Sequence, residues 1–260
     1  MAKIHKTAII NESCDIHDSV EIGPFCVIGP NVSLGENCIL NSHVVIKGPS
    51  KFGSGNKFFP FCIVGEDTPD LKFKGENTTL EVGQNNTFRE FSKVHRGTKA
   101  GISSTKIGNN NLIMPGVMIA HDCILGNNNV LVDNTALAGH VTLKDNITLG
   151  GYTLVHQFCQ LGSFSFSGMG SHITMDIPAF IRVAGNPTKP AGLNSIALER
   201  NAFTKNEISL IAAQELDCII HCGSQKLDGE ILNSSKFDSS HFLIVLATCF
   251  LPNLSFTHRV

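Results

Sequence analysis

Tryptophan is absent from this chain of 260 residues, and tyrosine occurs once. The formal net charge of −2 gives no global basic field that would attract nucleic acid. The longest apolar run, from Phe242 to Leu251, is too short to span a bilayer. These absences argue against a nucleic-acid-binding protein and against stable membrane insertion.

Familiar catalytic motifs are missing as well. No Gly-x-Ser-x-Gly elbow, Walker loop or dinucleotide fingerprint occurs. Nine cysteines are present, but six of them fall at one inward position of a repeat, where we expect small buried side chains and not disulfides or nucleophiles. Free thiols fit a reducing compartment, so we expect a cytoplasmic protein. The six are Cys14, Cys26, Cys38, Cys62, Cys123 and Cys159.

Aliphatic residues recur every six positions through most of the chain. One unbroken array runs from Ile107 to Leu161. An earlier array, in which Phe52 and Phe58 fill two of the positions, runs from Ile10 to Val64. Neither the 3.6-residue period of a helix nor the alternation of a strand gives this spacing. It is typical of a parallel β-helix, in which each hexapeptide is one short strand and a turn, and three hexapeptides close a coil. The sequence therefore predicts a mainly β fold.

The repeat is interrupted twice before it ends. Polar excursions at about 66–78 and 97–105 break the spacing, and loops of this length in a compact repeat are usually functional. We predict a β-helix over residues 1–191. A small C-terminal α-helical domain is predicted over 192–260, where apolar residues take helical spacing, with the tail after residue 252 as a candidate for disorder.

Three histidines fall on one predicted edge of this prism. Residues 18 apart lie above one another, about 4.8 Å apart along the axis, and His121, His140 and His156 follow anchors with that spacing. Asp122 would fix the tautomer of the His121 ring, as a general base requires. Gly139 leaves a backbone N–H uncrowded, as an oxyanion hole requires. The pattern favours acyl transfer by a histidine base without a covalent intermediate.

Other polar residues near this edge are candidates for substrate contacts. Gln157 offers a neutral donor and acceptor for a sugar or an amide. Asp70 and Lys72, in the first excursion, could bind substrate hydroxyls, although on their own they are better explained as solvated loop charges.

Six segments resemble one enzyme family, with a match from the N-terminus to about Phe203. They are similar to the acyl-carrier-protein-dependent UDP-N-acetylglucosamine O-acyltransferases of lipid A biosynthesis. The resemblance implies a left-handed parallel β-helix, assembled as a homotrimer, with a C-terminal helical domain. It also implies transfer of an (R)-3-hydroxyacyl group to the glucosamine 3-hydroxyl. The segments are GEDTPDLKFKGE (65–76), FREFSKVHRGT (88–98), IAHDCILGNNN (119–129), LAGHVTL (137–143), GGYTLVHQFCQLG (150–162) and GNPTKPAGLNS (185–195).

The resemblance also implies roles for single residues. His121 matches the general base, Asp122 its orienting partner and Gly139 the oxyanion N–H donor. Arg200 falls where the family faces a nucleotide phosphate. The other positions matched to substrate contacts are Asp70, Lys72, Met118, His140, His156, Gln157 and Asn194.

No metal and no resident cofactor are implied, because the acyl donor arrives on the phosphopantetheine of acyl carrier protein. The partners implied are that carrier, UDP-N-acetylglucosamine or a close analogue, and two further copies of the chain.

Met169 falls where the family stops the acyl chain, and longer-chain enzymes have glycine there. A methionine side chain there would displace several methylenes of a longer chain, each worth about 0.8 kcal/mol when buried. We therefore expect a preference for about ten carbons.

Departures from the family pattern leave alternatives open. Met118 stands where the family usually has a second histidine, so a 3-amino analogue of the UDP-sugar is an alternative acceptor. Ile196 and Asn201 replace an acidic residue and an arginine near the nucleotide. A trimeric β-helical zinc carbonic anhydrase would also cluster histidines. The later N-acyltransferase of the same pathway, a CoA-dependent acetyltransferase and a purely structural β-helix are further readings.

Overall fold

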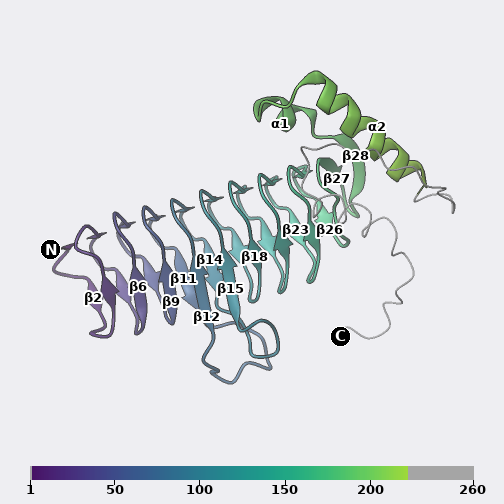
Figure 1. The fold of residues 1–260 in the computed structure, drawn as a ribbon. Coiled ribbons are helices and arrows are strands. Elements are labelled where there is room, and N and C mark those ends of the chain that lie inside the picture. The colour runs from purple at the N-terminus through teal and green to yellow at the C-terminus, as the bar shows by residue number, and fades with distance from the viewer. Residues whose placement is uncertain (1, 222–260) are drawn as a thin grey trace.

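The computed structural model describes residues 2–221 of the chain. They form a prism of stacked coils with helices at its C-terminal end (Figure 1). The side chains of residues 214–221 are not part of this description, and the predictions for 222–260, including the tail after residue 252, lie outside the described residues.

Three sheets form the sides of the prism, and all their strand pairs are parallel except β27 with β28. The first sheet contains β1 (Lys3–Ile4), β4 (Glu21–Ile22), β7 (Ile39–Leu40), β10 (Lys57–Phe58), β13 (Thr87–Phe88), β16 (Leu112–Ile113), β19 (Val130–Leu131), β22 (Thr148–Leu149), β25 (Phe166–Ser167), β27 (Ile181–Ala184) and β28 (Lys189–Leu193). The second contains β2 (Ile9–Ile10), β5 (Val27–Ile28), β8 (Val45–Ile46), β11 (Ile63–Glu66), β14 (Lys93–His95), β17 (Met118–Ile119), β20 (Ala136–Leu137), β23 (Leu154–Val155) and β26 (His172–Ile173). The third contains β3 (Asp15–Ile16), β6 (Val32–Leu34), β9 (Ser50–Phe52), β12 (Thr79–Val82), β15 (Ser104–Ile107), β18 (Ile124–Leu125), β21 (Thr142–Leu143) and β24 (Gln160–Leu161).

The six-residue period sets both the core and the corners. In the second sheet Ile119 pairs with Leu137, which pairs with Val155, and all three side chains are buried inside the coil. Most corners turn through one residue with positive φ, often asparagine, as at Asn128 with φ of 57°. Asparagine tolerates this left-handed conformation better than most residues. Repeating the pattern therefore stacks identical turns into straight edges.

A ladder of buried asparagines runs through the middle coils. The Oδ1 of Asn56 accepts a hydrogen bond from the backbone N–H of Asn86. In the same way Asn86 Oδ1 accepts the N–H of Asn111, and Asn111 Oδ1 accepts the N–H of Asn129, each at 2.9 Å. The rungs are 30, 25 and 18 residues apart. An uninterrupted coil takes 18 residues, so the two excursions add 12 and 7 residues without changing the register of the coils.

The coil gives way to helices after β28. Helix α1 (Ser195–Arg200) and helix α2 (Lys205–His221) follow, and Thr204 and Glu207 form reciprocal hydrogen bonds at the start of α2. The Phe203 ring packs edge-on against Phe164, with 5.4 Å between centroids, and so holds this segment to the last coils. Between residues 2 and 221 no helix has the length and apolar character needed to cross a membrane.

Candidate active site

The histidine edge lies at the corner where the second sheet passes into the third. His121 follows β17 and precedes β18, and His140 follows β20 and precedes β21. Both excursions leave the coil at the same corner, because residues 67–78 join β11 to β12 and residues 96–103 join β14 to β15. The interruptions of the repeat and the histidines therefore belong to one site.

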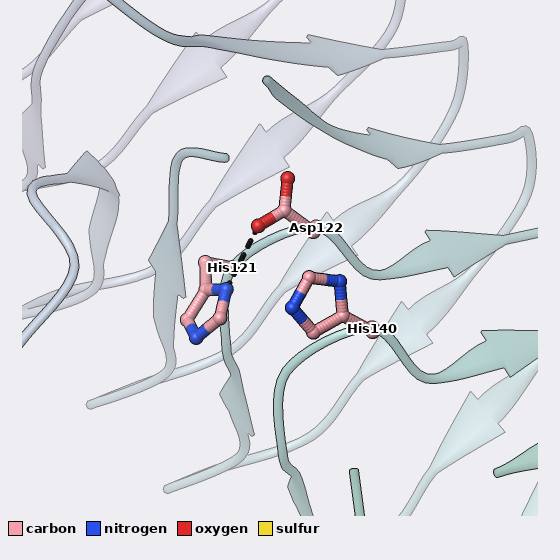
Figure 2. Close-up of side chains that lie close together, drawn as sticks. All are labelled: His121, Asp122 and His140. Carbon is pink, nitrogen blue, oxygen red and sulfur yellow. Dashed lines mark hydrogen bonds and ion pairs between the residues drawn. The ribbon is translucent and has the colours of Figure 1, made fainter. Parts of the chain in front are cut away.

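His121 and Asp122 form a hydrogen-bonded pair, with 2.8 Å between His121 Nδ1 and Asp122 Oδ2 (Figure 2). The Asp122 carboxylate is buried and accepts hydrogen bonds from the backbone N–H of Thr98 at 3.0 Å, from Thr98 Oγ1 at 2.6 Å and from the N–H of Ile102 at 3.0 Å. Burial alone would raise the pKa of this carboxyl. The hydrogen bonds from His121 and Thr98 outweigh it, so the pKa lies below its ordinary value. Asp122 is therefore ionised, and His121 donates its Nδ1 proton.

Two glycines make room for this pair. A Cβ on Gly101 would lie 2.4 Å from Asp122 Cγ, so the second excursion can cover the carboxylate only with glycine there. A Cβ on Gly139 would lie 2.5 Å from Cε1 and 2.7 Å from Nε2 of His121. Gly139 therefore packs against the His121 imidazole at Cε1 and Nε2, where a larger residue would clash.

His140 lies beside this pair and completes the cluster in Figure 2. Its backbone turns the corner with φ of 64°. Its ring meets His121 edge-on at 5.1 Å and stacks on Phe158 at 4.5 Å between centroids. Burial lowers the pKa of His140, so the ring is neutral at pH 7 and can both donate and accept a hydrogen bond.

His156 shares the corner but not the cluster. Residues 18 apart stack, so His156 continues the column of Ala120 and Ala138. The backbone N–H of each of these three residues donates to the residue 17 positions later. Its ring is exposed, with Nδ1 3.2 Å from the Gln157 carbonyl, and Gln157 is exposed beside it. The structure thus brings together two of the three imidazoles that the spacing places on this edge.

The first excursion brings Asp70 toward the histidines. Its Oδ1 accepts the N–H of Lys72 at 2.8 Å in a local turn, and Lys72 itself is exposed. The Asp70 carboxylate is near enough to His140 to favour the charged form of that ring, although burial of the ring outweighs this effect on its pKa. Met118 lies on the outward side of β17, half-buried between its strand neighbours Lys93 and Ala136.

The remaining predicted residues lie apart from the cluster in one chain. Asn194 is buried, and its Nδ2 donates to the Phe164 carbonyl at 2.8 Å. Arg200 is exposed at the end of α1. Met169 is 78% exposed at the turn that enters β26, whereas His140 lies where β20 ends. It therefore occupies the opposite end of the strands of the second sheet.

Sequence reasoning missed the residues that support the pair. Thr98 and Ile102 hold the Asp122 carboxylate, and both belong to the second excursion. His95 and Arg96 bind Asp67 at the base of the first excursion. Burial lowers the pKa of His95. The sequence pointed to residues 95–98 only through a resemblance, although their place before a break in the repeat was a signal that they support the loops.

The same cluster is the group of candidate metal ligands found in residues 2–221. One ligand atom each from His121, Asp122 and His140 lie within 4.8 Å of one another. The Asp122 oxygens already accept hydrogen bonds from two backbone N–H groups, a hydroxyl and an imidazole. A cation would have to displace part of this network, so the donor set suits a hydrogen-bonded pair better than a metal.

Comparisons with known proteins agree with one another. The profile described as "Bacterial transferase hexapeptide (six repeats)" matches residues 13–48 and 104–139, and "Udp N-acetylglucosamine O-acyltransferase; Domain 2" matches 176–214. An acyl-[acyl-carrier-protein]–UDP-N-acetylglucosamine O-acyltransferase of Stutzerimonas stutzeri is 49% identical over 162 residues. That alignment spans 62% of this chain and 63% of the relative, less than two thirds of its length.

Solved structures extend the likeness to most of the chain. The UDP-N-acetylglucosamine O-acyltransferase of Moraxella catarrhalis superposes with a TM-score of 0.82 at 40% identity, covering 86% of each chain. The Arabidopsis UDP-N-acetylglucosamine acyltransferase gives 0.75 at 31% identity, covering 98% of each. These neighbours are left-handed β-helices, so the predicted fold class is confirmed. The chain belongs to the UDP-N-acetylglucosamine O-acyltransferase family of hexapeptide-repeat proteins.

Proposed function

We propose that this protein transfers an (R)-3-hydroxyacyl group from acyl carrier protein to the 3-position of UDP-N-acetylglucosamine, the first step of lipid A biosynthesis. The observation that carries the proposal is the His121–Asp122 pair, a base with a fixed tautomer at the corner where both excursions leave the coil. Within residues 2–221 no hydrogen bond engages His121 Nε2, so that nitrogen is open to a substrate hydroxyl.

The pair accounts for each proton in the reaction. His121 Nε2 takes the proton of the sugar 3-hydroxyl as its oxygen attacks the thioester carbonyl. Asp122, ionised and buried, stabilises the imidazolium that forms. The N–H of Gly139, which has no hydrogen-bond acceptor among the described residues, would bind the oxyanion. The imidazolium then returns the proton to the departing pantetheine thiolate, so no covalent enzyme intermediate is needed.

The other predicted contacts fit a site completed by a neighbouring subunit of a homotrimer. The outward positions of the second sheet are mostly apolar, including Ile9, Val27 and Leu154. The third sheet instead carries charges outward, among them Lys51 and Glu81, and suits solvent. An apolar face of this kind is typical of a subunit interface. A second copy on it would bring a Met169, and an Arg200 beyond it, toward the corner that holds His121.

The acyl donor is carried by acyl carrier protein, and the proposed mechanism needs no further cofactor. We assign the reaction to the cytoplasm, where the free thiols of the coil stay reduced. Burial raises the pKa of Cys62 and Cys123 to about 12, which keeps both thiols protonated and unreactive.

The test is a transfer assay with a panel of hydroxyacyl carrier proteins and UDP-N-acetylglucosamine, with products identified by mass. The wild-type chain should acylate the sugar, and His121→Ala should lower kcat about 10²–10⁴-fold while leaving the circular dichroism unchanged. Near-normal turnover by His121→Ala would refute the mechanism. The mass of the protein in solution should equal three chains.

The 3-amino analogue of the sugar is a second candidate acceptor. Met118 places a thioether, and no imidazole, on the outward side of β17 three residues before His121. An amine is a stronger nucleophile than a hydroxyl and depends less on a hydrogen-bond acceptor at that point. Competition between the two UDP-sugars decides the matter, and a clear preference for the 3-hydroxyl sugar would exclude this candidate.

A further inference from the structure

A buried arginine anchors the base of the first excursion. The Arg96 side chain is only 9% exposed, and its Nη1 donates to the Gly65 carbonyl at 2.5 Å. Its Nη2 forms an ion pair with the Asp67 carboxylate, whose side chain is 52% exposed. The backbone N–H of Arg96 donates to the Glu66 carbonyl at 2.9 Å. One residue thus binds three consecutive positions at the point where the chain leaves the coil.

The preceding residue holds the same point from another side. His95 Nδ1 lies 2.8 Å from the Asp67 carbonyl, so Asp67 is bound through its carboxylate by Arg96 and through its backbone by His95. The strand register shifts here, with Val64 opposite Val94 but Glu66 opposite His95. This irregularity turns the chain outward, and the two side chains fix the direction in which it turns.

Beyond this base the excursion is held mainly by local bonds. Asp70 closes a turn through the N–H groups of Lys72 and Phe73, at 2.8 and 3.0 Å. Leu71 at the tip is fully exposed. Among the described residues the hydrogen bonds of this turn are local, so the position of Asp70 relative to His140 depends on the direction set at the base.

The same short segment also supports the catalytic pair. Two residues after Arg96, Thr98 donates both its N–H and its hydroxyl to the Asp122 carboxylate. A single backbone stretch therefore binds the first excursion at one end and the orienting carboxylate at the other, which fixes the distance between them.

We propose that Arg96 and Asp67 form a positioning clamp that holds the turn of Asp70 and Lys72 toward His140 and so sets the affinity for the acceptor sugar. The inference rests on the proposed function, in which Asp70 and Lys72 hold that sugar. Arg96 and Asp67 act through the loop and touch no reacting atom.

The direct test is Asp67→Asn, which removes the charge at the exposed end of the pair and leaves the buried Arg96 in place. The KM for the UDP-sugar should rise about tenfold, whereas kcat and the KM for the acyl carrier protein should change less than about threefold. Lys47→Gln is the matched control. It breaks the Lys47–Glu66 ion pair of 2.8 Å beside the same strand end, keeps the Arg96–Asp67 ion pair and the Glu66 carboxylate that accepts the Asp67 N–H, and should leave all three constants unchanged.

A double-mutant cycle separates positioning from general destabilisation. In an Asp70→Asn background the loop has already lost its sugar contact, so adding Asp67→Asn should raise the KM for the sugar less than about twofold further. Two independent, multiplicative effects would overturn the proposal. Arg96→Lys, which keeps the charge but loses the planar fork, should show the same selective rise in KM to a smaller extent.

Amide hydrogen exchange gives a readout that needs no turnover. Exchange across residues 68–74 should be faster in Asp67→Asn than in wild type and unchanged in Lys47→Gln. Equal exchange in wild type and Asp67→Asn would overturn the clamp even if the wild-type enzyme is active. If the wild type failed to acylate the UDP-sugar, the proposed function would fall, while the exchange result would still decide whether the clamp exists.

Discussion

Replacing Asp122 with asparagine should disable His121 through its tautomer. In the native chain Oδ1 accepts the backbone N–H of Ile102, and Oδ2 accepts Thr98 Oγ1 and His121 Nδ1. The Thr98 N–H is shared by Oδ1 at 3.1 Å and Oδ2 at 3.0 Å. Backbone donors cannot turn away, and only the Oδ1 position accepts both N–H groups, so the single oxygen of the introduced amide must take that position. Its NH₂ group then faces His121 Nδ1, which can only accept. The proton moves to Nε2, the nitrogen that the mechanism needs free.

The magnitude follows from the bond that is lost. Restoring the Nδ1–H tautomer would set two donors against each other and forfeit a charge-assisted hydrogen bond worth about 1.5–3 kcal/mol. Since about 1.36 kcal/mol is a factor of ten in rate, kcat for Asp122→Asn should fall about 10- to 100-fold. The thermal midpoint should fall only modestly, because the amide still pairs with the backbone donors and the Thr98 hydroxyl.

Two measurements check this prediction. Steady-state acyl transfer gives kcat, and the ¹⁵N chemical shifts of labelled histidine report which ring nitrogen of His121 carries the proton. Asp145→Asn is the matched control, because Asp145 accepts two N–H groups of Asn127 at 2.6 and 3.0 Å on the corner between the third and first sheets, where no histidine is bound. A variant that kept kcat within about threefold, or kept the Nδ1–H tautomer, would refute the reasoning.

Three further changes probe the site. Gly139→Ala places a methyl group 2.5 Å from His121 Cε1 and should lower kcat about 10²-fold with an unchanged circular dichroism spectrum; full activity would mean that the ring can move freely. Met169→Gly should shift the donor preference by a few carbons toward longer chains, whereas Met175→Gly, also at an exposed methionine, should not; matching profiles would end the ruler assignment. Burial lowers the pKa of His140, so the unfolded chain binds that proton more readily. The stability that the neutral His140 ring contributes is therefore fully present above about pH 6.5. It is lost as the pH falls from there through the lower pKa of the folded state. The melting temperature should fall with pH over this range, and it should fall less steeply in His140→Asn, a residue that suits the φ of 64°. The same dependence of melting temperature on pH in the variant and the wild type would refute this prediction.

The six-residue period was sufficient to predict the coil. An inward aliphatic side chain every sixth residue has one architectural outcome, because the position of each anchor fixes its neighbours 18 residues away. The same arithmetic could have resolved the histidines further. His121 stacks with Gly139, Asp122 with His140, and Ala138 with His156, so the columns already separate His156 from the other two rings.

The support of Asp122 could not be predicted from the period. Thr98 and Ile102 lie 24 and 20 residues before Asp122, in an excursion that follows no repeat. Their approach depends on the path of an irregular loop and on the absence of a side chain at Gly101. Likewise, the period predicted where the chain leaves the coil but gave no sign that Arg96 and Asp67 would pair there.

The buried asparagine ladder bears on how the chain is assembled during translation. Asn56 directs its Oδ1 to the N–H of Asn86, and its Nδ2 to the carbonyl of Gly83, both of which belong to the following coil. Asn129 at the upper end likewise binds the N–H of Ile147 and the carbonyl of Lys144. Each rung is satisfied only when the next coil closes above it, so a nascent chain emerging from the ribosome always has an open, hydrated end. Folding therefore propagates from one coil to its neighbour, with each finished coil serving as the template on which the next one pairs.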